Sequence, residues 1–218
     1  KAGIRVAAIE PEQNFLPVNI ATEQKYLREE SLRQLRFYIE NAASFDCDRV
    51  IIYPGKGAMD HPYSEAWKYS CESLYQLEKT AEKCGVTILL QNVSRFISNL
   101  TPDSEAVKKI LDEVGGNHLG VSVNTSAVCA AGETLEDYFK TFGSRVGVVQ
   151  LSDSDEEDEQ MVLGEGVQDI EGHVAALDRN RYQGPVALEI TMEEYAYEAE
   201  TYYSKSVNYL KSIWGSVK

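Results

Sequence analysis

Short apolar segments alternate with longer amphipathic segments along almost the whole chain, and this alternation constrains the fold more than any other feature. The apolar segments are rich in Val, Ile and Leu and show little polar alternation, which is typical of strands covered on both faces in a parallel sheet. We expect strands at residues 4–9, 50–53, 86–90, 119–123, 146–151 and 186–190.

The segments between these strands have the spacing of amphipathic helices. We expect helices at residues 22–44, 64–84, 133–142, 170–179 and 204–214. Another helix is expected to begin at Thr101-Pro102, an N-cap residue followed by proline, and to end at Gly115-Gly116.

Strict alternation of strand and helix predicts an α/β fold, either an open doubly wound sheet or a (βα)8 barrel. No G-x-G-x-x-G or G-x-x-x-x-G-K-[ST] pattern follows any of the expected strands, which argues against the usual nucleotide-binding open sheets. No linker or change of composition divides the chain, so we expect a single domain over residues 1–218.

The charge balance limits the kinds of partner. The 218 residues include 35 Asp and Glu but only 21 Lys and Arg, which gives a formal net charge of −14. A strongly acidic surface repels nucleic acids and anionic membranes, so a small molecule or a protein is the expected partner. No long apolar run or secretion signal is recognisable, and we expect a cytoplasmic location.

Polar side chains follow most of the expected strands, where the functional sites of α/β proteins are found. We expect substrate-binding residues among them: Glu10, Lys56, Gln91, Asn124, Gln150 and Asp153. The last strand ends at a further carboxylate, Glu189. Polar residues are common in loops, so no single position is specific by itself.

Five segments have an order and spacing that match a known family. They are residues 52–55 (IYPG), 85–93 (GVTILLQNV), 119–125 (LGVSVNT), 148–153 (VVQLSD) with 163–166 (LGEG), and 184–190 (GPVALEI). Together they resemble the xylose isomerase-like TIM barrel superfamily of sugar phosphate isomerases and epimerases and AP endonuclease relatives. The resemblance implies a (βα)8 TIM barrel in which the first strand of this chain is the third, so the first two β-α units are expected to be absent.

The resemblance also implies a reaction. In this family one divalent metal is held by Glu, Asp, His and Glu at the ends of strands five to eight. A hard cation such as Mg²⁺ or Mn²⁺ prefers such ligands, and its charge stabilises the enediolate formed when a proton leaves the carbon beside a carbonyl. The two glutamates usually move that proton.

The sequence departs from this ligand set at three of four positions. Where the family has Glu, Asp and His, this chain has the neutral amides Gln91, Asn124 and Gln150. Only Glu189 is retained, as the expected catalytic residue and the one remaining metal ligand. Two further family histidines correspond to Ala127 and Gln160. We therefore expect no tightly bound cofactor and, at most, weak binding of Mn²⁺ or Mg²⁺.

Gln91 and Asn124 keep the shape of the Glu and Asp that they replace, and the amides can hydrogen-bond sugar hydroxyls. We expect a sugar isomerase/epimerase-like protein with a degraded metal site that acts on or binds a small keto-sugar or polyol. An active enzyme would move a proton beside a carbonyl through Glu189. The alternative is a non-catalytic carbohydrate-binding or regulatory subunit partnered with another chain. Absent β-α units would leave strand edges open, so a homo-oligomer or a partner chain that completes the barrel is also expected.

Two other features are weaker. The acidic run in residues 153–159 lacks the glycine and the closing glutamate of a calcium loop, so we expect a solvated loop that acts as a lid or contacts a basic partner. The three histidines, His61, His118 and His173, are expected at the surface or at helix caps, which argues against a zinc cluster of the AP endonuclease kind.

Overall fold

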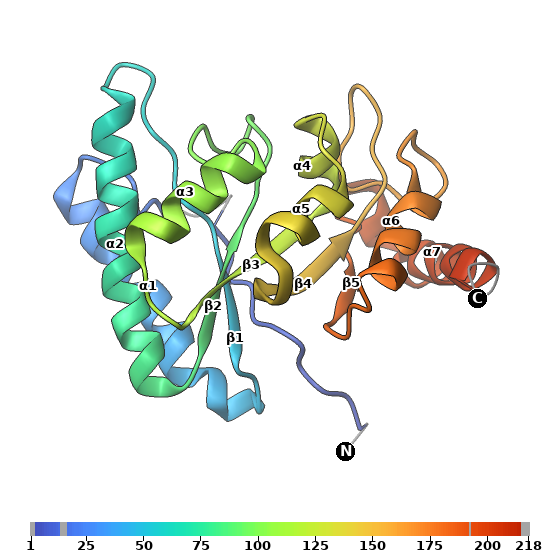
Figure 1. Cartoon of the computed structure of the whole chain (residues 1–218), viewed down its shortest axis with the longest axis horizontal. Helices are drawn as coiled ribbons and strands as arrows, with labels where there is room; N and C mark the ends of the chain where they lie inside the picture. The colour runs from blue at the N-terminus through green and yellow to red at the C-terminus, as the bar shows by residue number, and fades with distance from the viewer. Residues whose placement is uncertain (1–2, 14–16, 192, 215–218) are drawn as a thin grey trace. The chain divides into compact units, whose positions relative to one another are not determined.

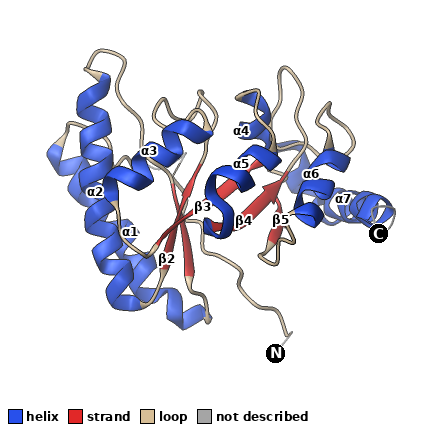
Figure 2. Cartoon of the chain, in the orientation of Figure 1, coloured by secondary structure: helices blue, strands red, loops and turns tan. Residues whose placement is uncertain are grey.

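A computed structural model describes residues 3–13, 17–191 and 193–214. The chain forms two compact units, Lys1–Ser122 and Val123–Lys218. Strands and helices alternate in both, which confirms the α/β class (Figures 1 and 2). The single domain expected over residues 1–218 stays a prediction.

The first unit has a parallel sheet covered by long helices. Its strands are β1 (Arg49–Ile52), β2 (Thr87–Gln91) and the first part of β3 (Leu119–Asn124). β1 pairs with β2 from Arg49↔Thr87 to Ile52↔Leu90, and β2 pairs with β3 from Ile88↔Leu119 to Gln91↔Ser122. The helices are α1 (Lys25–Asn41), with the short 3-10 helix η1 (Ala42–Phe45) after it, α2 (Tyr63–Cys84) and α3 (Ser104–Val114).

Apolar side chains at helical spacing hold these layers together. α1 packs against β1 and α2, and α2 packs against β2 (Figure 1). α1 buries Leu32, Leu35 and Ile39, while α2 buries Leu74 and Leu77. Because removing such side chains from water is the main favourable term in folding, this core fixes where the carboxyl ends of the strands lie.

The second unit contains the end of β3, two more strands and shorter helices. β4 (Val146–Leu151) pairs in parallel with β5 (Val186–Leu188), from Val149↔Val186 to Leu151↔Leu188. The helices are α4 (Thr125–Ala130), α5 (Leu135–Phe142), α6 (Ile170–Arg179) and α7 (Ala199–Trp214), with 3-10 helices η2 (Gly143–Arg145) and η3 (Glu193–Glu198). α4 and α5 pack on β4, and α6 packs against α5 and α7.

Several expected elements differ from the observed ones, and the helix expected over residues 22–44, for example, is observed as α1 over Lys25–Asn41. The strand expected at residues 4–9 is reduced to a bridge between Ile9 and Val50, because in that register the earlier residues lie beyond the start of β1. The helix expected from Thr101 begins at Ser104, since the Asp103 side chain accepts a hydrogen bond from the Ala106 N–H and caps it. α7 begins five residues before the expected position 204.

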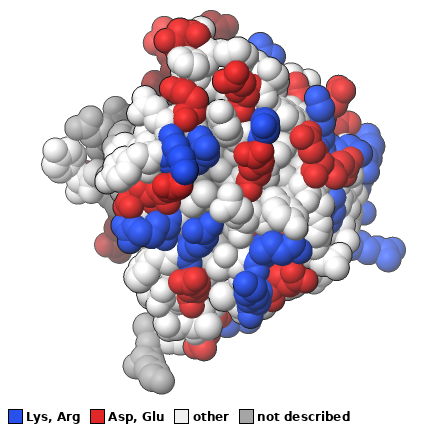
Figure 3. Space-filling view, turned by 90° about the vertical axis from the view of Figure 1, so that its left-hand side faces the viewer, with Lys and Arg blue, Asp and Glu red and all other residues white. Residues whose placement is uncertain are grey.

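No helix in the described ranges combines the length and the apolar composition needed to cross a membrane. On the face drawn in Figure 3, acidic and basic side chains are interspersed rather than gathered into one basic stripe.

Candidate functional site

The carboxylate of Glu189 lies just after β5 and accepts hydrogen bonds from two amides. Asn124 Nδ2 donates to Glu189 Oε2 at 2.5 Å, and Gln160 Nε2 donates to Glu189 Oε1 at 2.7 Å. The backbone N–H of Glu189 donates to the carbonyl of Leu151 at 2.9 Å, which continues the pairing with β4. Glu189 is half-buried. The structure therefore brings two amides onto the one carboxylate that the family pattern retains.

Asn124 uses both ends of its amide group. It is the N-cap of α4, and its Oδ1 accepts a hydrogen bond from the Ala127 N–H at 2.9 Å. With the oxygen fixed in this way, the NH2 group faces Glu189. An amide beside a carboxylate must present its donor, so the two contacts agree on one orientation of the side chain.

Gln160 was not among the expected substrate-binding residues, although it occupies a family histidine position. Its backbone is left-handed, with a φ of 63°, and its Oε1 accepts a hydrogen bond from the Thr191 hydroxyl. A positive φ is uncommon for residues other than glycine. The family histidine position could have marked Gln160 as a site residue. The turn that brings its side chain to Glu189, however, has no clear sequence pattern.

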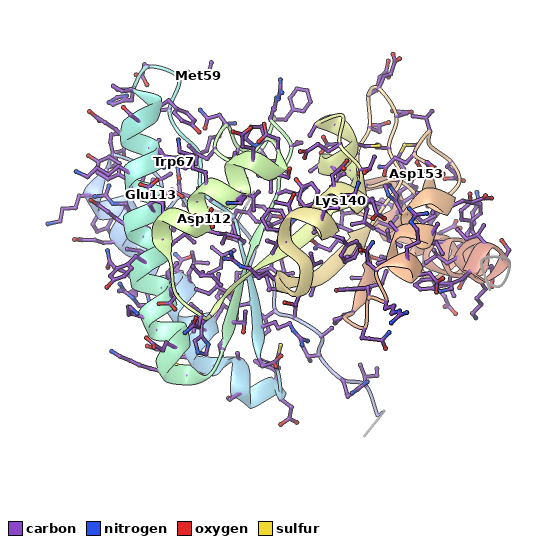
Figure 4. The ribbon with its side chains drawn as sticks, viewed as in Figure 1. Met59, Trp67, Asp112, Glu113, Lys140 and Asp153 are labelled. Carbon is purple, nitrogen blue, oxygen red and sulfur yellow. The ribbon has the colours of Figure 1, made fainter. Side chains whose placement is uncertain are left out.

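Gln150 and Asp153 have different settings. Gln150 is buried on β4, where it pairs with Ala187 of β5. Asp153 is 1% exposed, and it lies after β4 in the second unit (Figure 4). Its carboxylate accepts backbone hydrogen bonds from Ser154 (2.9 Å), Gly164 (2.9 Å) and Gln168 (3.0 Å). Through these three hydrogen bonds, Asp153 fixes the conformation of the surrounding loop.

The Gly-Glu-Gly turn packs directly on Asp153. A Cβ atom added to Gly166 would lie 2.4 Å from Asp153 Oδ1 and 2.4 Å from the Ser154 carbonyl oxygen. Asp153 and Met161 also exchange two backbone hydrogen bonds, at 3.1 and 2.9 Å, in an antiparallel bridge. The acidic segment between them is therefore closed at its base, with Asp155, Glu156, Glu157 and Asp158 exposed.

A buried polar network beneath this loop was missed by the sequence analysis. Gln168 donates to Ser126 (3.1 Å) and Ser154 (2.8 Å), and its Oε1 lies 3.1 Å from His173 Nε2. Ser126 also contacts the Ser152 hydroxyl at 2.7 Å. Such a satisfied network makes the loop conformation specific, because each buried polar atom needs its partner.

The expected surface position of His173 is wrong. The side chain is 7% exposed, and burial lowers its pKa below the usual value. The missed signal is periodicity, because His173 is three residues after Ile170 and four before Leu177, which are both buried on α6. His61 lies in an exposed loop, and His118 is half-buried with Nδ1 2.8 Å from the Val86 carbonyl oxygen.

The remaining expected site residues belong to the first unit. Gln91 ends β2 and is 1% exposed, and its Oε1 has no hydrogen-bond partner among the described residues. Ser94, in the loop that follows, is also buried with a hydroxyl that no described residue satisfies. Unsatisfied buried polar atoms are costly and often mark a place where a ligand or water binds.

Glu10 and Lys56 lie near the end of β1. Glu10 accepts a hydrogen bond from the Tyr53 hydroxyl at 2.9 Å, and Lys56 Nζ donates to the Phe96 carbonyl oxygen at 2.9 Å. Both side chains are exposed. Within the described part of the chain, no three His, Cys, Asp or Glu side chains are grouped so that they could hold a metal ion.

Comparisons with known proteins agree with the fold of this chain. The curated fructoselysine 3-epimerase of Shigella flexneri is 24% identical over 181 residues, which are 83% of this chain and 66% of that protein, just under two thirds. Among solved structures, a D-tagatose 3-epimerase-like protein has a TM-score of 0.80 at 18% identity, covering 97% of this chain and 80% of that one. The IOLI protein with a binding zinc atom has a TM-score of 0.79 at 17% identity, covering 98% and 78%.

The family model described as xylose isomerase-like TIM barrel matches residues 1–213. This match includes the strands that carry Gln91, Asn124, Gln150 and Glu189. It confirms the family resemblance and the barrel type expected from the sequence. The chain therefore belongs to the xylose isomerase-like TIM barrel family.

Proposed function

We propose that this protein binds a small keto-sugar or polyol at the carboxyl ends of its strands, and that the divalent-metal site of its family is degraded. The observation that carries the proposal is the setting of Glu189, whose two carboxylate oxygens accept N–H donors from Asn124 and Gln160. A protein ligand to Mg²⁺ or Mn²⁺ must instead offer an oxygen lone pair.

The donor set does not fit a tightly bound divalent cation. An amide NH2 group has no lone pair for a metal, and Asn124 cannot turn its oxygen toward Glu189 without losing the cap of α4. Gln160 is held similarly, since its oxygen accepts from Thr191. One carboxylate would then be the only charged ligand, which is a weak site for a hard cation.

The same groups suit hydroxylated ligands. A sugar hydroxyl both donates and accepts, so it can take the place of either amide on Glu189 or bridge the amide and the carboxylate. In the first unit, taken by itself, the buried Gln91 Oε1, which no described residue satisfies, is also an acceptor for a hydroxyl. The epimerase relative and the sugar-epimerase-like structure support a carbohydrate as the ligand class.

A second candidate function is epimerisation or isomerisation without a tightly held metal, and Glu189 is the observation that favours it. A carboxylate at the end of β5 could remove a proton from the carbon beside a carbonyl and return it. Hydrogen bonds to its charged form lower the basicity of a carboxylate, and no formal charge on the neighbouring amides would stabilise the enediolate. The geometry therefore favours binding over turnover.

The test of binding is a thermal-shift and calorimetric titration with D-fructose, D-tagatose and myo-inositol. We expect at least one of them to raise the melting temperature, because a ligand that binds only the folded state stabilises it. Glu189→Gln should weaken that binding by about tenfold or more, the usual effect of losing a charge-assisted hydrogen bond. Glu171→Gln, which removes an exposed carboxylate on α6, is the matched control.

Two further measurements separate the parts of the proposal. A clear stabilisation by stoichiometric Mn²⁺ would contradict the degraded metal site. Nuclear magnetic resonance of the ketoses in heavy water tests the second candidate, because proton removal beside a carbonyl places deuterium on carbon. We expect no enzyme-dependent deuterium incorporation, whereas incorporation that Glu189→Gln abolishes would establish catalysis.

A further inference from the structure

A groove of about 500 Å³ lies in the first unit at the carboxyl end of β1. It is formed by residues of the segment before α1, the start of α1 and the loops after β1 and β2. Its volume is in the range of small-molecule sites, roughly 300–1,000 Å³. Its apolar walls are Pro17, Val18, Ile20, Leu27, Phe96 and Ile97.

The polar side chains of the walls are already used to hold the loops. Asn19 Oδ1 accepts from the Lys56 N–H (3.0 Å), and Asn19 Nδ2 donates to the Lys56 carbonyl oxygen (2.9 Å). Gln13 Oε1 accepts from the Tyr53 N–H at 3.0 Å, and Ser98 Oγ donates to the Gly55 carbonyl oxygen at 2.6 Å. These groups shape the groove and leave it effectively apolar.

The loop after β1 is fixed by close packing as well as by hydrogen bonds. Gly55 has a φ of 80°, and a Cβ there would lie 2.6 Å from Asn19 Oδ1 and 2.7 Å from the Ala21 nitrogen. On the other side of Lys56, the Gly57 N–H donates to Asn99 Oδ1 at 2.9 Å. The backbone on both sides of Lys56 is therefore held in place, so ligand binding costs little further loss of backbone conformational entropy.

Lys56 supplies the only charge among the described lining residues. No Asp or Glu is among the lining residues that the structure describes, although the chain has a formal net charge of −14. The ammonium group has three N–H donors, of which one goes to the Phe96 carbonyl oxygen, and it makes no ion pair with a described residue. Two donors therefore remain at the edge of an apolar groove.

We propose that this groove is a binding site for a small amphipathic monocarboxylate, with the apolar body between Leu27 and Phe96 and the carboxylate on Lys56. Phe96 is 87% exposed, so a ligand would cover apolar surface that now faces water. A single ammonium balances a carboxylate, whereas a phosphate dianion would leave one charge uncompensated in an acidic protein. All the residues concerned belong to the first unit, so the proposal does not depend on the chemistry of Glu189.

The experiment is a calorimetric titration of the full chain with 3-phenylpropionate, and with 3-phenylpropanol and phenyl phosphate as comparison ligands. We expect the carboxylate to bind at least about tenfold more tightly than the alcohol, because it forms charge-assisted hydrogen bonds. Equal affinity of carboxylate and alcohol would overturn the role of Lys56. Tighter binding of phenyl phosphate would overturn the assignment to carboxylates.

Variants locate the site. Lys56→Met should weaken 3-phenylpropionate by about tenfold, and Lys56→Arg should retain most of the affinity because the charge remains. Phe96→Ala should weaken it by about threefold through lost aromatic contact. Lys68→Met and Phe37→Ala, which remove exposed side chains of the same kinds on α2 and α1, are the controls and should bind like the parent.

Two results would reject the groove as the site. One is unchanged affinity in Lys56→Met that melts at the parent temperature. The other is unchanged affinity in Phe96→Ala that melts at the parent temperature, since the ligand's apolar body should lose its contact with the aromatic ring. If Lys56→Met fails to fold, Lys56→Arg and Phe96→Ala still test whether the groove binds 3-phenylpropionate. Phe96→Ala should lose affinity for it, and Lys56→Arg should not.

Discussion

Asn124 has a separate bonding role at each atom of its amide group, and this makes a single-atom exchange informative. An Asp at this position would still cap α4 through one oxygen, but it would place a second carboxylate against Glu189 at the 2.5 Å contact. Two carboxylates at this distance do not ionise together without a large cost. The pair would therefore keep a proton in the folded state to a higher pH than when unfolded.

We predict that Asn124→Asp is about 1–2 kcal/mol less stable than the parent near neutral pH and about equal to it near pH 4. The direction of this change with pH follows from the linkage between proton binding and folding. A raised folded-state pKa means that the folded variant binds more protons, so its stability falls as pH rises. Urea unfolding at the two pH values measures the difference. Equal stability at neutral pH would show that Asn124 and Glu189 are not in contact.

His173 gives a pH dependence of the opposite sign. Burial lowers its pKa, although Asp169 and Asp153 act in the other direction. The unfolded chain therefore takes up a proton near the usual value of about 6.5 while the folded chain does not, so stability falls as the pH drops below that value. We predict that the free energy of unfolding falls less in His173→Gln than in the parent between pH 7 and pH 5.5, as measured by urea unfolding. An equal fall in the parent and in His173→Gln would contradict this prediction.

Single residues could be predicted from the sequence only where a strand end or a family position marked them. Glu189 and Asn124 were recognised in this way, and the structure brings them together. Gln160 reaches Glu189 through a left-handed turn, and its contact depends on backbone geometry that no residue pattern specifies. Substrate binding by Asp153 stays a prediction, while in the structure its oxygens accept hydrogen bonds from three backbone N–H groups. That role of the residue becomes visible only with the loop in place.

At the scale of elements, the loop that joins β4 to α6 depends on Asp153. We predict that Asp153→Ala loses about 3 kcal/mol of unfolding free energy, because three buried N–H groups lose a charged acceptor. Asp158→Ala, which removes an exposed carboxylate from the same loop, should change it by less than about 0.5 kcal/mol. Urea unfolding of the three proteins compares them, and similar stabilities of the two variants would contradict the organising role.

The elements themselves were largely predictable because the hydrophobic period is strong. α6 has the expected bounds, and α2 and β4 differ from expectation by at most one residue. Many of the errors lie at the ends of elements, where a cap decides, as Asp103 does for α3. α4 was not expected, because its six residues are too few to show a period. The two β-α units expected before the first strand stay a prediction.

At the scale of the whole molecule, each compact unit contains one of the two tryptophans. Trp67 is on α2 and donates a hydrogen bond to Glu113 of α3 at 2.7 Å (Figure 4), while Trp214 is the last residue of α7. If residues 1–218 form one domain, both must report the same unfolding transition. We predict coincident urea midpoints for Trp67→Phe, which leaves Trp214 as the probe, and Trp214→Phe, which leaves Trp67.

Those two midpoints are compared with the far-ultraviolet circular dichroism of each variant, which controls for changes in stability caused by the substitution. A fluorescence midpoint that differs from the dichroism midpoint of the same variant would show that the units unfold separately.

Charge also acts at the scale of the whole molecule. Most ion pairs between the described residues join exposed side chains, so screening them by salt costs little stability, while the formal net charge of −14 disfavours the compact state.

The bridge between Asp153 and Met161 has a practical consequence for protein engineering. Because the two backbone hydrogen bonds close the acidic segment at its base, the chain enters and leaves that segment at neighbouring points. A peptide tag or a small reporter domain inserted between Glu156 and Glu157 would therefore project into solvent from a fixed stem. The loop is a natural attachment point, at which added sequence leaves the strands and the core unchanged.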